Sequence, residues 1–267
     1  MTVAFVLSGG ANLGALQVGM LRALMEREVE PDFLVGTSVG ALNAGYIAGR
    51  GLRPDVVDDL GEIWRGLHTW QLFPPSPRRI VSVLRGHQAA LFGDQGLRLL
   101  TKRHLTLERI EDALIPLTVV ATDLLTGNEV DIRSGPAAEW DGRLLIDGGI
   151  ADNTAISNAV EAGADTIYVL PSGYPCALVE PPTSITGTLL HTMTLLIHKR
   201  LVRDIREYTG AAELIVLPPP CPLEVGPLDF SRADELIDRG YEASAAFLKT
   251  DGGRRRAPAD HIDLHVH

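Results

Sequence analysis

Phe33-Leu34-Val35-Gly36-Thr37-Ser38-Val39-Gly40-Ala41-Leu42-Asn43-Ala44 is the stretch that decides the fold. It begins as a short apolar run, passes through Gly-x-Ser-x-Gly and continues in small residues that suit a helix. This order predicts a strand, a sharp turn and a helix in direct succession, which is the setting of a nucleophile elbow. Gly36 and Gly40 are needed there because a Cβ at either position would collide with the neighbouring strand or helix. We therefore predict that Ser38 is a nucleophile whose hydroxyl projects above the edge of a sheet.

A glycine-rich turn follows the first predicted strand, Val3 to Leu7. Its sequence is Ser8-Gly9-Gly10-Ala11-Asn12-Leu13-Gly14, and a helical pattern follows it. A strand that opens through glycines into a helix presents backbone N–H groups to an anion. The turn does not fit a dinucleotide fingerprint, since Ala11 stands where the second glycine would be and no acidic residue closes a second strand. An oxyanion hole fits better, because a nucleophilic serine needs amide donors from another strand–helix junction.

The third informative stretch runs from Leu144 to Asn153, where an apolar strand ends in Asp147 and two glycines. The end of the strand is expected to place Asp147 at the carboxyl edge of the sheet, where ligands bind in open α/β folds. Asp-Gly-Gly is also a common tight turn, and the residues alone leave that alternative open. Asp152 and Asn153 are candidate caps for the helix that follows.

Strands alternate with helices along the chain, which predicts a mainly parallel sheet covered by helices on both faces. We expect a single α/β domain over residues 1–250 and a flexible tail over residues 251–267. Further strands are predicted over residues 117–123, 129–133, 166–170 and 213–217, and helices over residues 54–67, 155–161, 187–208 and a final segment capped by Ser231 with Asp234.

The predicted helix over residues 187–208 is long and amphipathic. Its basic residues are expected to be solvated charges, with contact to a lipid surface as the alternative. The apolar stripe consists of Leu190, Met193, Ile197, Leu201 and Ile205, and the basic residues are Lys199, Arg200, Arg203 and Arg206.

Composition excludes several classes of function. The chain has 267 residues, a formal net charge of −10 and only 5% aromatic residues, which argues against a nucleic-acid partner and against strong attraction to an anionic bilayer. Cys176 and Cys221 lie beside prolines without metal or redox spacing, so we expect a reduced, cytoplasmic protein. The N-terminus is expected to be a first strand and not a signal peptide, and no apolar run approaches the length of a membrane span. No metal motif is present, so we expect no metal site and no cofactor.

Three motifs together carry a resemblance to a known family: the glycine turn of residues 7–14, the elbow of residues 36–40, and Asp147-Gly148-Gly149. In this order and at these distances the chain resembles the patatin-like phospholipases over roughly residues 3–250. Members of that family are lipid acyl hydrolases with a Ser–Asp dyad and no catalytic histidine, on a three-layer α/β/α fold. The resemblance implies Ser38 as the nucleophile and Asp147 as its partner. It also implies an oxyanion hole formed by the backbone of Gly9, Gly10 and Ala11.

The same resemblance implies a lipid or fatty-acyl ester as substrate, with transient contact to a membrane surface. The chain departs from the family pattern at Ala11, where a third glycine is usual, at Leu13, where an arginine or lysine is usual, and at Ala155, where a proline is usual. Without a cation at position 13, neutral or single-chain esters are expected as readily as phospholipids.

Two rival functions remain open from the residues. One is an esterase with a histidine base, because His191 and His198 follow Ser38 and Asp147 in the chain order of α/β-hydrolases. The other is a nucleotide-binding or regulatory protein that uses the glycine turn and carries an inert serine.

Overall fold

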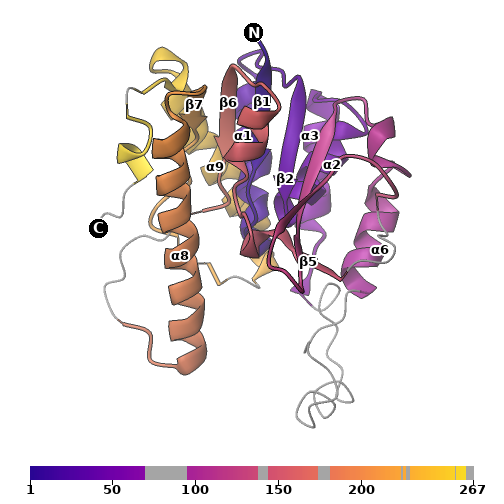
Figure 1. Ribbon diagram of the computed structural model, residues 1–267, viewed down its shortest axis with the longest axis vertical. Helices are drawn as coiled ribbons and strands as arrows, with labels where there is room; N and C mark the ends of the chain where they lie inside the picture. The colour runs from indigo at the N-terminus through magenta and orange to yellow at the C-terminus, as the bar shows by residue number, and fades with distance from the viewer. Residues whose placement is uncertain are drawn as a thin grey trace.

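The computed structural model describes residues 1–69, 95–137, 144–173, 181–223, 225–226, 229–255 and 257–262. Its centre is a seven-stranded sheet in the order β4-β3-β2-β1-β6-β7, with β5 also paired to β3 (Figure 1). Four strand pairings are parallel, whereas β4 and β5 run antiparallel to β3, so the predicted mainly parallel sheet is confirmed. The strands are β1 Val3–Leu7, β2 Phe33–Thr37, β3 Leu117–Asp123, β4 Glu129–Ile132, β5 Leu145–Asp147, β6 Thr166–Leu170 and β7 Glu213–Val216.

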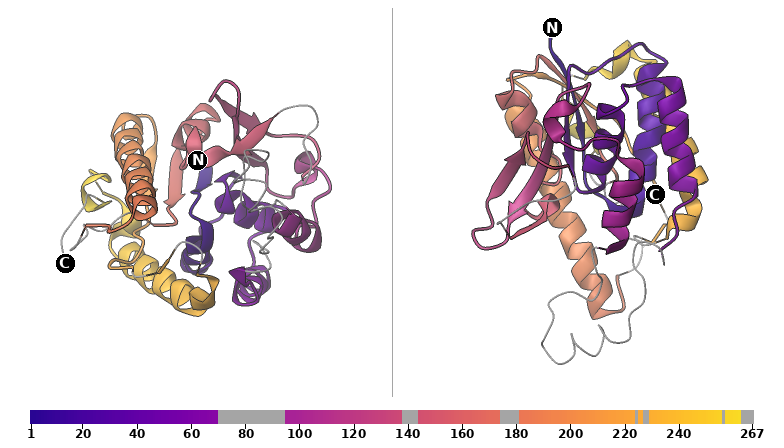
Figure 2. Two further views of the ribbon diagram at one scale, coloured as in Figure 1. Left: turned by 90° about the horizontal axis from the view of Figure 1, so that it is seen from below. Right: turned by 90° about the vertical axis from the view of Figure 1, so that its right-hand side faces the viewer.

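Helices cover both faces of this sheet, which confirms a three-layer α/β/α architecture (Figure 2). Helices α1, α2, α3 and α9 pack on one face, and α7 and α8 pack on the other. Within the described parts of the chain, no helix combines the length and apolar content that crossing a membrane requires. The α-helices are α1 Ala15–Met25, α2 Val39–Ala48, α3 Pro54–Arg65, α6 Gln95–His104, α7 Ile156–Glu161, α8 Ile185–Tyr208 and α9 Ala233–Leu248.

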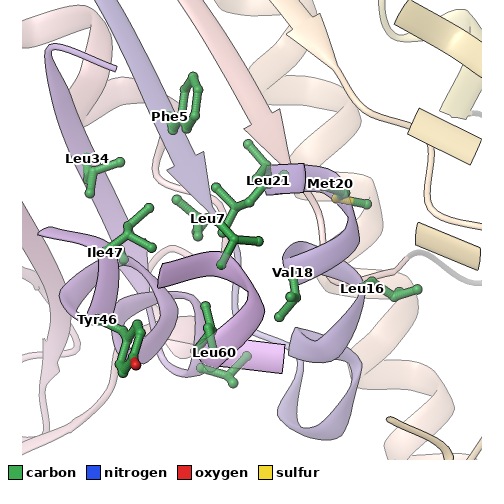
Figure 3. Close-up of a cluster of buried hydrophobic side chains, with 14 of the residues drawn as sticks. Phe5, Leu7, Leu16, Val18, Met20, Leu21, Leu34, Tyr46, Ile47 and Leu60 are labelled. Carbon is green, nitrogen blue, oxygen red and sulfur yellow. The ribbon is translucent and has the colours of Figure 1, made fainter. Parts of the chain in front are cut away.

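The buried side chains of β1 alternate between the two helical layers, because successive residues of a strand point to opposite faces. Phe5 and Leu7 belong to the core under α1, α2, α3 and α9, and Figure 3 shows them among side chains of α1 and α2. Ala4 and Val6 belong to the second core, under α7 and α8. The strand is therefore apolar throughout, as the sequence pattern required of a central parallel strand.

Residues 251–255 and 257–262, which fall in the predicted flexible tail, contain side chains that pack against the edge of the sheet. Ala259 and Ile262 are buried in the core that includes β7, and the ring of His261 lies 2.9 Å from the carbonyl oxygen of Val216. These apolar side chains bury surface against β7. The charge-rich composition of the region gave no sign of this packing.

Two further expectations are wrong. Cys221 is disulfide-bonded, so the chain does not carry two reduced thiols, and the partner of Cys221 lies outside the described residues. Ser231 with Asp234 does not cap α9: Ser231 donates to Asp229 through its amide and hydroxyl, and Asp234 pairs with Arg65. Spacing alone could not identify these partners, because the disulfide and the ion pair both depend on tertiary contact.

Helices α1 and α9 cross so closely that their backbones touch. A Cβ on Gly19 would overlap the carbonyl oxygen of Ile237, and one on Gly240 would overlap the carbonyl oxygen of Leu16. Each helix therefore needs a glycine at the crossing, although glycine costs a helix interior about 1 kcal/mol relative to alanine.

We predict that Gly19→Ala lowers the free energy of unfolding by about 3 kcal/mol or more, because the overlap is with backbone that cannot turn aside. Gly61→Ala in α3 is the matched control, since a Cβ there meets only ordinary contacts, the nearest to Arg65 at 3.4 Å. That control should raise the stability by up to about 1 kcal/mol through helix propensity. Urea unfolding checks both variants, and equal effects would contradict the close crossing.

Candidate active site

Ser38 lies at the sharp turn between β2 and α2, in a backbone conformation that side chains rarely adopt. Its φ is 52° and its ψ is −124°, so the strained turn predicted from Gly-x-Ser-x-Gly is present. A Cβ on Gly40 would overlap the carbonyl oxygens of Leu7 and Ser8, and one on Gly36 would overlap the backbone of Ala41. The glycines thus allow α2 to start directly against β1 and leave the Ser38 side chain half-buried at the sheet edge.

The sheet register brings Asp147 to this turn. Thr37, the last residue of β2, is paired with Val120, and Asp147, the last residue of β5, is paired with the next residue, Ala121. Ala121 is also paired with β4, which occupies the other side of β3, so β5 lies on the same side as β2. The two strands therefore meet nearly end to end along β3. Asp147 does lie at the carboxyl edge, but it arrives on an antiparallel strand that runs toward β2, not on another parallel one.

The hydroxyl of Ser38 donates a hydrogen bond to Oδ2 of Asp147 at 2.5 Å, across 109 positions of sequence. The other carboxylate oxygen, Oδ1, accepts from the amide of Gly149 at 2.8 Å. Hydroxyl–carboxylate hydrogen bonds of this length are charge-assisted and strong. A Cβ on Gly148 would overlap the carbonyl oxygen of Val120, so this glycine lets the turn press against β3. The arrangement can lower the cost of removing the Ser38 proton.

The glycine turn lies directly beside Ser38, since a Cβ on Gly9 would be 3.1 Å from the Cβ of Ser38. The amide of Gly9 donates to the carbonyl oxygen of Asn153 at 3.0 Å, so this amide is already engaged. Among the described residues, the amides of Gly10 and Ala11 have no hydrogen-bond acceptor. Ala11 has a φ of 50°, the left-handed conformation for which a third glycine would be better suited.

Asn153 ties the two loops of the site together, a role that the sequence did not reveal. Its side-chain amide donates to the carbonyl oxygen of Gly9 at 3.2 Å, while its own carbonyl accepts from the Gly9 amide. The expectation that it caps α7 is wrong, because the first turn of α7 has no side-chain cap. The loop that carries Asp147 is therefore fastened to the glycine turn by a reciprocal pair of hydrogen bonds.

A buried polar network holds the glycine turn from behind. The side-chain amide of Gln17, fully buried on α1, donates to the carbonyl oxygens of Ser8 and Leu170 and to the hydroxyl of Ser172. Its oxygen accepts from Asn43 of α2 at 2.8 Å. A network in which the donors and acceptors are paired fixes one geometry, because any shift leaves a buried polar group unsatisfied.

Asp152 links the same loop to α8. Its side chain is 3% exposed and pairs with Arg200 at 2.9 Å, and its carbonyl oxygen accepts from the hydroxyl of Thr37. Arg200 also contacts Asp204 at 3.3 Å, so it is not the solvated charge that the helix pattern suggested. Burial raises the pKa of both carboxyl groups, and the Arg200 guanidinium opposes that shift.

The two candidate histidine bases both lie on α8. His198 is buried and His191 is partly exposed. Within the described ranges the Ser38 hydroxyl donates to Asp147 and to no histidine. The part of the chain that the structure describes also contains no group of three His, Cys, Asp or Glu side chains that could hold a metal ion.

Asp123, at the end of β3, shapes the turn into β4. Its Oδ1 accepts hydrogen bonds from the amides of Leu125 and Thr126, each at 3.0 Å, and from the Thr126 hydroxyl. These contacts form the turn into β4 and do not involve Ser38.

Part of the chain matches a known family. Residues 5–134 match the patatin-like phospholipase family, a span that includes the glycine turn and Ser38 and ends before Asp147. The predicted resemblance is thus confirmed over the part of the chain that carries the glycine turn and the elbow.

Among curated proteins, the chain is similar to a lysophospholipase NTE1 of Mycosarcoma maydis, with 23% identity over 93% of this chain. It is also similar to the patatin-like phospholipase domain-containing protein ZK370.4 of Caenorhabditis elegans, with 28% identity over 64% of this chain. The chain spans only 15% and 14% of the lengths of these relatives.

Among solved structures, human GIVD cytosolic phospholipase A2, in complex with methyl γ-linolenyl fluorophosphonate, aligns over 99% of this chain and 60% of its own. The identity is 12% and the TM-score 0.47. VipD from Legionella pneumophila aligns over 93% of this chain and 67% of its own, with 14% identity and a TM-score of 0.43.

Replacement of Arg200 is predicted to have a pH-dependent effect. Arg200→Met should lower the free energy of unfolding by about 2 kcal/mol at pH 8, because the buried Asp152 carboxylate loses its cation. A carboxyl group whose pKa is raised on folding stabilises the protein fully below its unfolded pKa, and that stabilisation is lost as the pH rises through the folded pKa. The loss in free energy of unfolding caused by Arg200→Met should therefore become smaller as the pH is lowered from 8 toward 5.

Urea unfolding of the variant and the parent at both pH values measures this effect. Lys199→Met, which removes the neighbouring exposed cation of α8, should change the stability by less than about 0.5 kcal/mol. If Arg200→Met lowered the free energy of unfolding equally at both pH values, or more at pH 5, the assigned role of the Asp152–Arg200 pair would be contradicted.

Proposed function

We propose that this chain is a lipid acyl hydrolase that works through an acyl-serine intermediate. The observation that carries the proposal is the hydrogen bond from Ser38 to Asp147 at the carboxyl edge of the sheet. The match to the patatin-like phospholipase family and similarity to lysophospholipases support it. The substrate class is a lipid or fatty-acyl ester, and the residues at the site require no cofactor for this chemistry.

In the first half of the proposed reaction, Oγ of Ser38 attacks the ester carbonyl carbon while its proton passes to Asp147. The oxyanion that develops is stabilised by the amides of Gly10 and Ala11, which have no acceptor among the described residues. Gly9 contributes by holding the turn against Asn153. The alcohol then leaves with the proton from Asp147, and the acyl group remains on Ser38.

In the second half, water attacks the acyl-serine carbonyl and gives its proton to Asp147. The same two amides stabilise the second oxyanion, and its collapse releases the fatty acid as the proton returns to Ser38. A carboxylate is a weak base toward a hydroxyl. The proposed mechanism therefore depends on preorganised donors, each of which is typically worth about 10²–10³ in turnover.

The residues of the glycine turn favour a broad choice of ester. Leu13 is half-buried and packs against the apolar core, so this position offers no cation for a phosphate. We therefore propose that neutral and single-chain esters are accepted alongside phospholipids.

The dyad predicts a specific pattern of kinetic effects. Ser38→Ala and Asp147→Asn should each lower kcat for a p-nitrophenyl ester by at least about 10³-fold, because each removes half of the hydroxyl–carboxylate pair. His191→Ala and His198→Gln should stay within about threefold of the parent, with folding checked by circular dichroism.

The same measurement distinguishes the rival functions. Loss of turnover in a well-folded histidine variant would favour a histidine base and contradict the dyad. A folded parent chain without ester turnover would favour a binding or regulatory protein that uses the glycine turn.

A further inference from the structure

The first half of α8 exposes a row of large apolar side chains. Of the predicted apolar stripe, Leu201 and Ile205 in the second half of the helix are buried in the core, together with Val202. In Figure 1 and in the right panel of Figure 2, the first half projects beyond the sheet. The exposed side chains are Ile185 at 90%, Leu189 at 59%, Leu190 at 48%, Met193 at 45% and Leu196 at 65%.

Most of this apolar row faces away from the protein core. Ile185, Leu189, Met193 and Leu196 follow one another at steps of four, four and three residues, which places them within about 80° of the helix circumference. Ile205, fully buried, lies on the opposite side of the same helix by this periodicity. The second half therefore anchors α8 in the core while the first half presents an apolar ridge outward.

Three threonine hydroxyls of the projecting half are satisfied within the helix. The hydroxyls of Thr188, Thr192 and Thr194 donate to the carbonyl oxygens four residues earlier, at 3.0, 2.8 and 2.9 Å. Such internal bonds let a threonine enter an apolar medium without leaving a donor unpaired. From Ile185 to Ile197 the sequence contains no Asp, Glu, Lys or Arg.

Other exposed apolar side chains gather at the same edge of the sheet. Leu124 and Leu125 follow the end of β3, and Leu144 and Ile150 flank the strand and turn that carry Asp147. The amide of Leu124 donates to the carbonyl oxygen of Leu144 at 2.8 Å, so these segments are adjacent. Large apolar side chains exposed together mark a surface that contacts a partner or a membrane.

We infer that the projecting half of α8, residues 185–197, docks on a zwitterionic phospholipid surface. This docking would bring the carboxyl edge of the sheet, where Ser38 and Asp147 lie, to the lipid. The inference rests on the proposed function, since a lipid ester is presented to an enzyme from such a surface. The net charge of −10 and the uncharged ridge favour a neutral surface over an anionic one. Lys199, about 4.5 Å farther along the axis than Leu196, is placed to meet the phosphate layer when the ridge is inserted.

Vesicle flotation tests this docking surface. The full-length chain carrying Ser38→Ala, which spares the lipid, is mixed with vesicles of phosphatidylcholine and its bound fraction is measured. Adding Leu189→Ser with Met193→Ser should weaken partitioning by about 30-fold or more, because two large apolar side chains no longer enter the lipid. Leu114→Ser is the matched control: Leu114 is 70% exposed and lies before β3, at the opposite edge of the sheet, so partitioning should not change.

Each outcome has a defined meaning. Absence of flotation by the parent, or equal loss in the α8 and Leu114 variants, would overturn the docking surface. Sedimentation equilibrium of the same variants provides a second readout, and a dimer abolished by the α8 changes would assign the ridge to a second copy of the chain.

Hydrolysis of soluble p-nitrophenyl butyrate by the unmodified chain is measured separately. Flotation without hydrolysis would contradict the proposed function, and hydrolysis without flotation would contradict only the docking surface.

Discussion

The site depends on one alignment in the sheet: β2 and β5 meet nearly end to end on the same side of β3. Thr37 is paired with Val120 and Asp147 with Ala121, so the next residue of β2, Ser38, emerges beside the carboxylate. A register shift of one residue in either strand would turn its side chains to the opposite face. The direct hydrogen bond between Ser38 and Asp147 is therefore a consequence of how three strands are paired.

Close backbone contacts and buried polar groups keep this alignment in place. Glycines at the elbow and after Asp147 let the chain lie directly on β1 and β3, where a side chain would not fit. Gln17 and Asn43 hold the glycine turn from the side of α1 and α2, while Asn153 joins that turn to the loop of Asp147. Arg200 fastens the same loop to α8 through Asp152. Hydrogen bonds and close packing thus hold the site on both sides, which suits a mechanism that relies on preorganised donors.

Sequence reasoning could predict the elbow, because strand, glycine and helix signals are all local in Phe33 to Ala44. It could not predict that β5 is antiparallel, since three residues, Leu145 to Asp147, carry no directional signal. Arg200 and Asn153 were also missed in their actual roles, because both depend on partners far away in the chain. The exposure of the first half of α8 could not be predicted for a related reason. Periodicity shows which residues share a face of the helix, but not how far the sheet extends beneath that face.

Covalent labelling with a fluorophosphonate, followed by mass mapping of the modified peptide, asks directly whether Ser38 is an activated nucleophile. We expect a single adduct on Ser38 of the folded chain, formed much more slowly when Asp147 is replaced by Asn. A folded chain that remained unlabelled, or one labelled at the same rate without the carboxylate, would contradict the claim that the Ser38–Asp147 contact activates the serine.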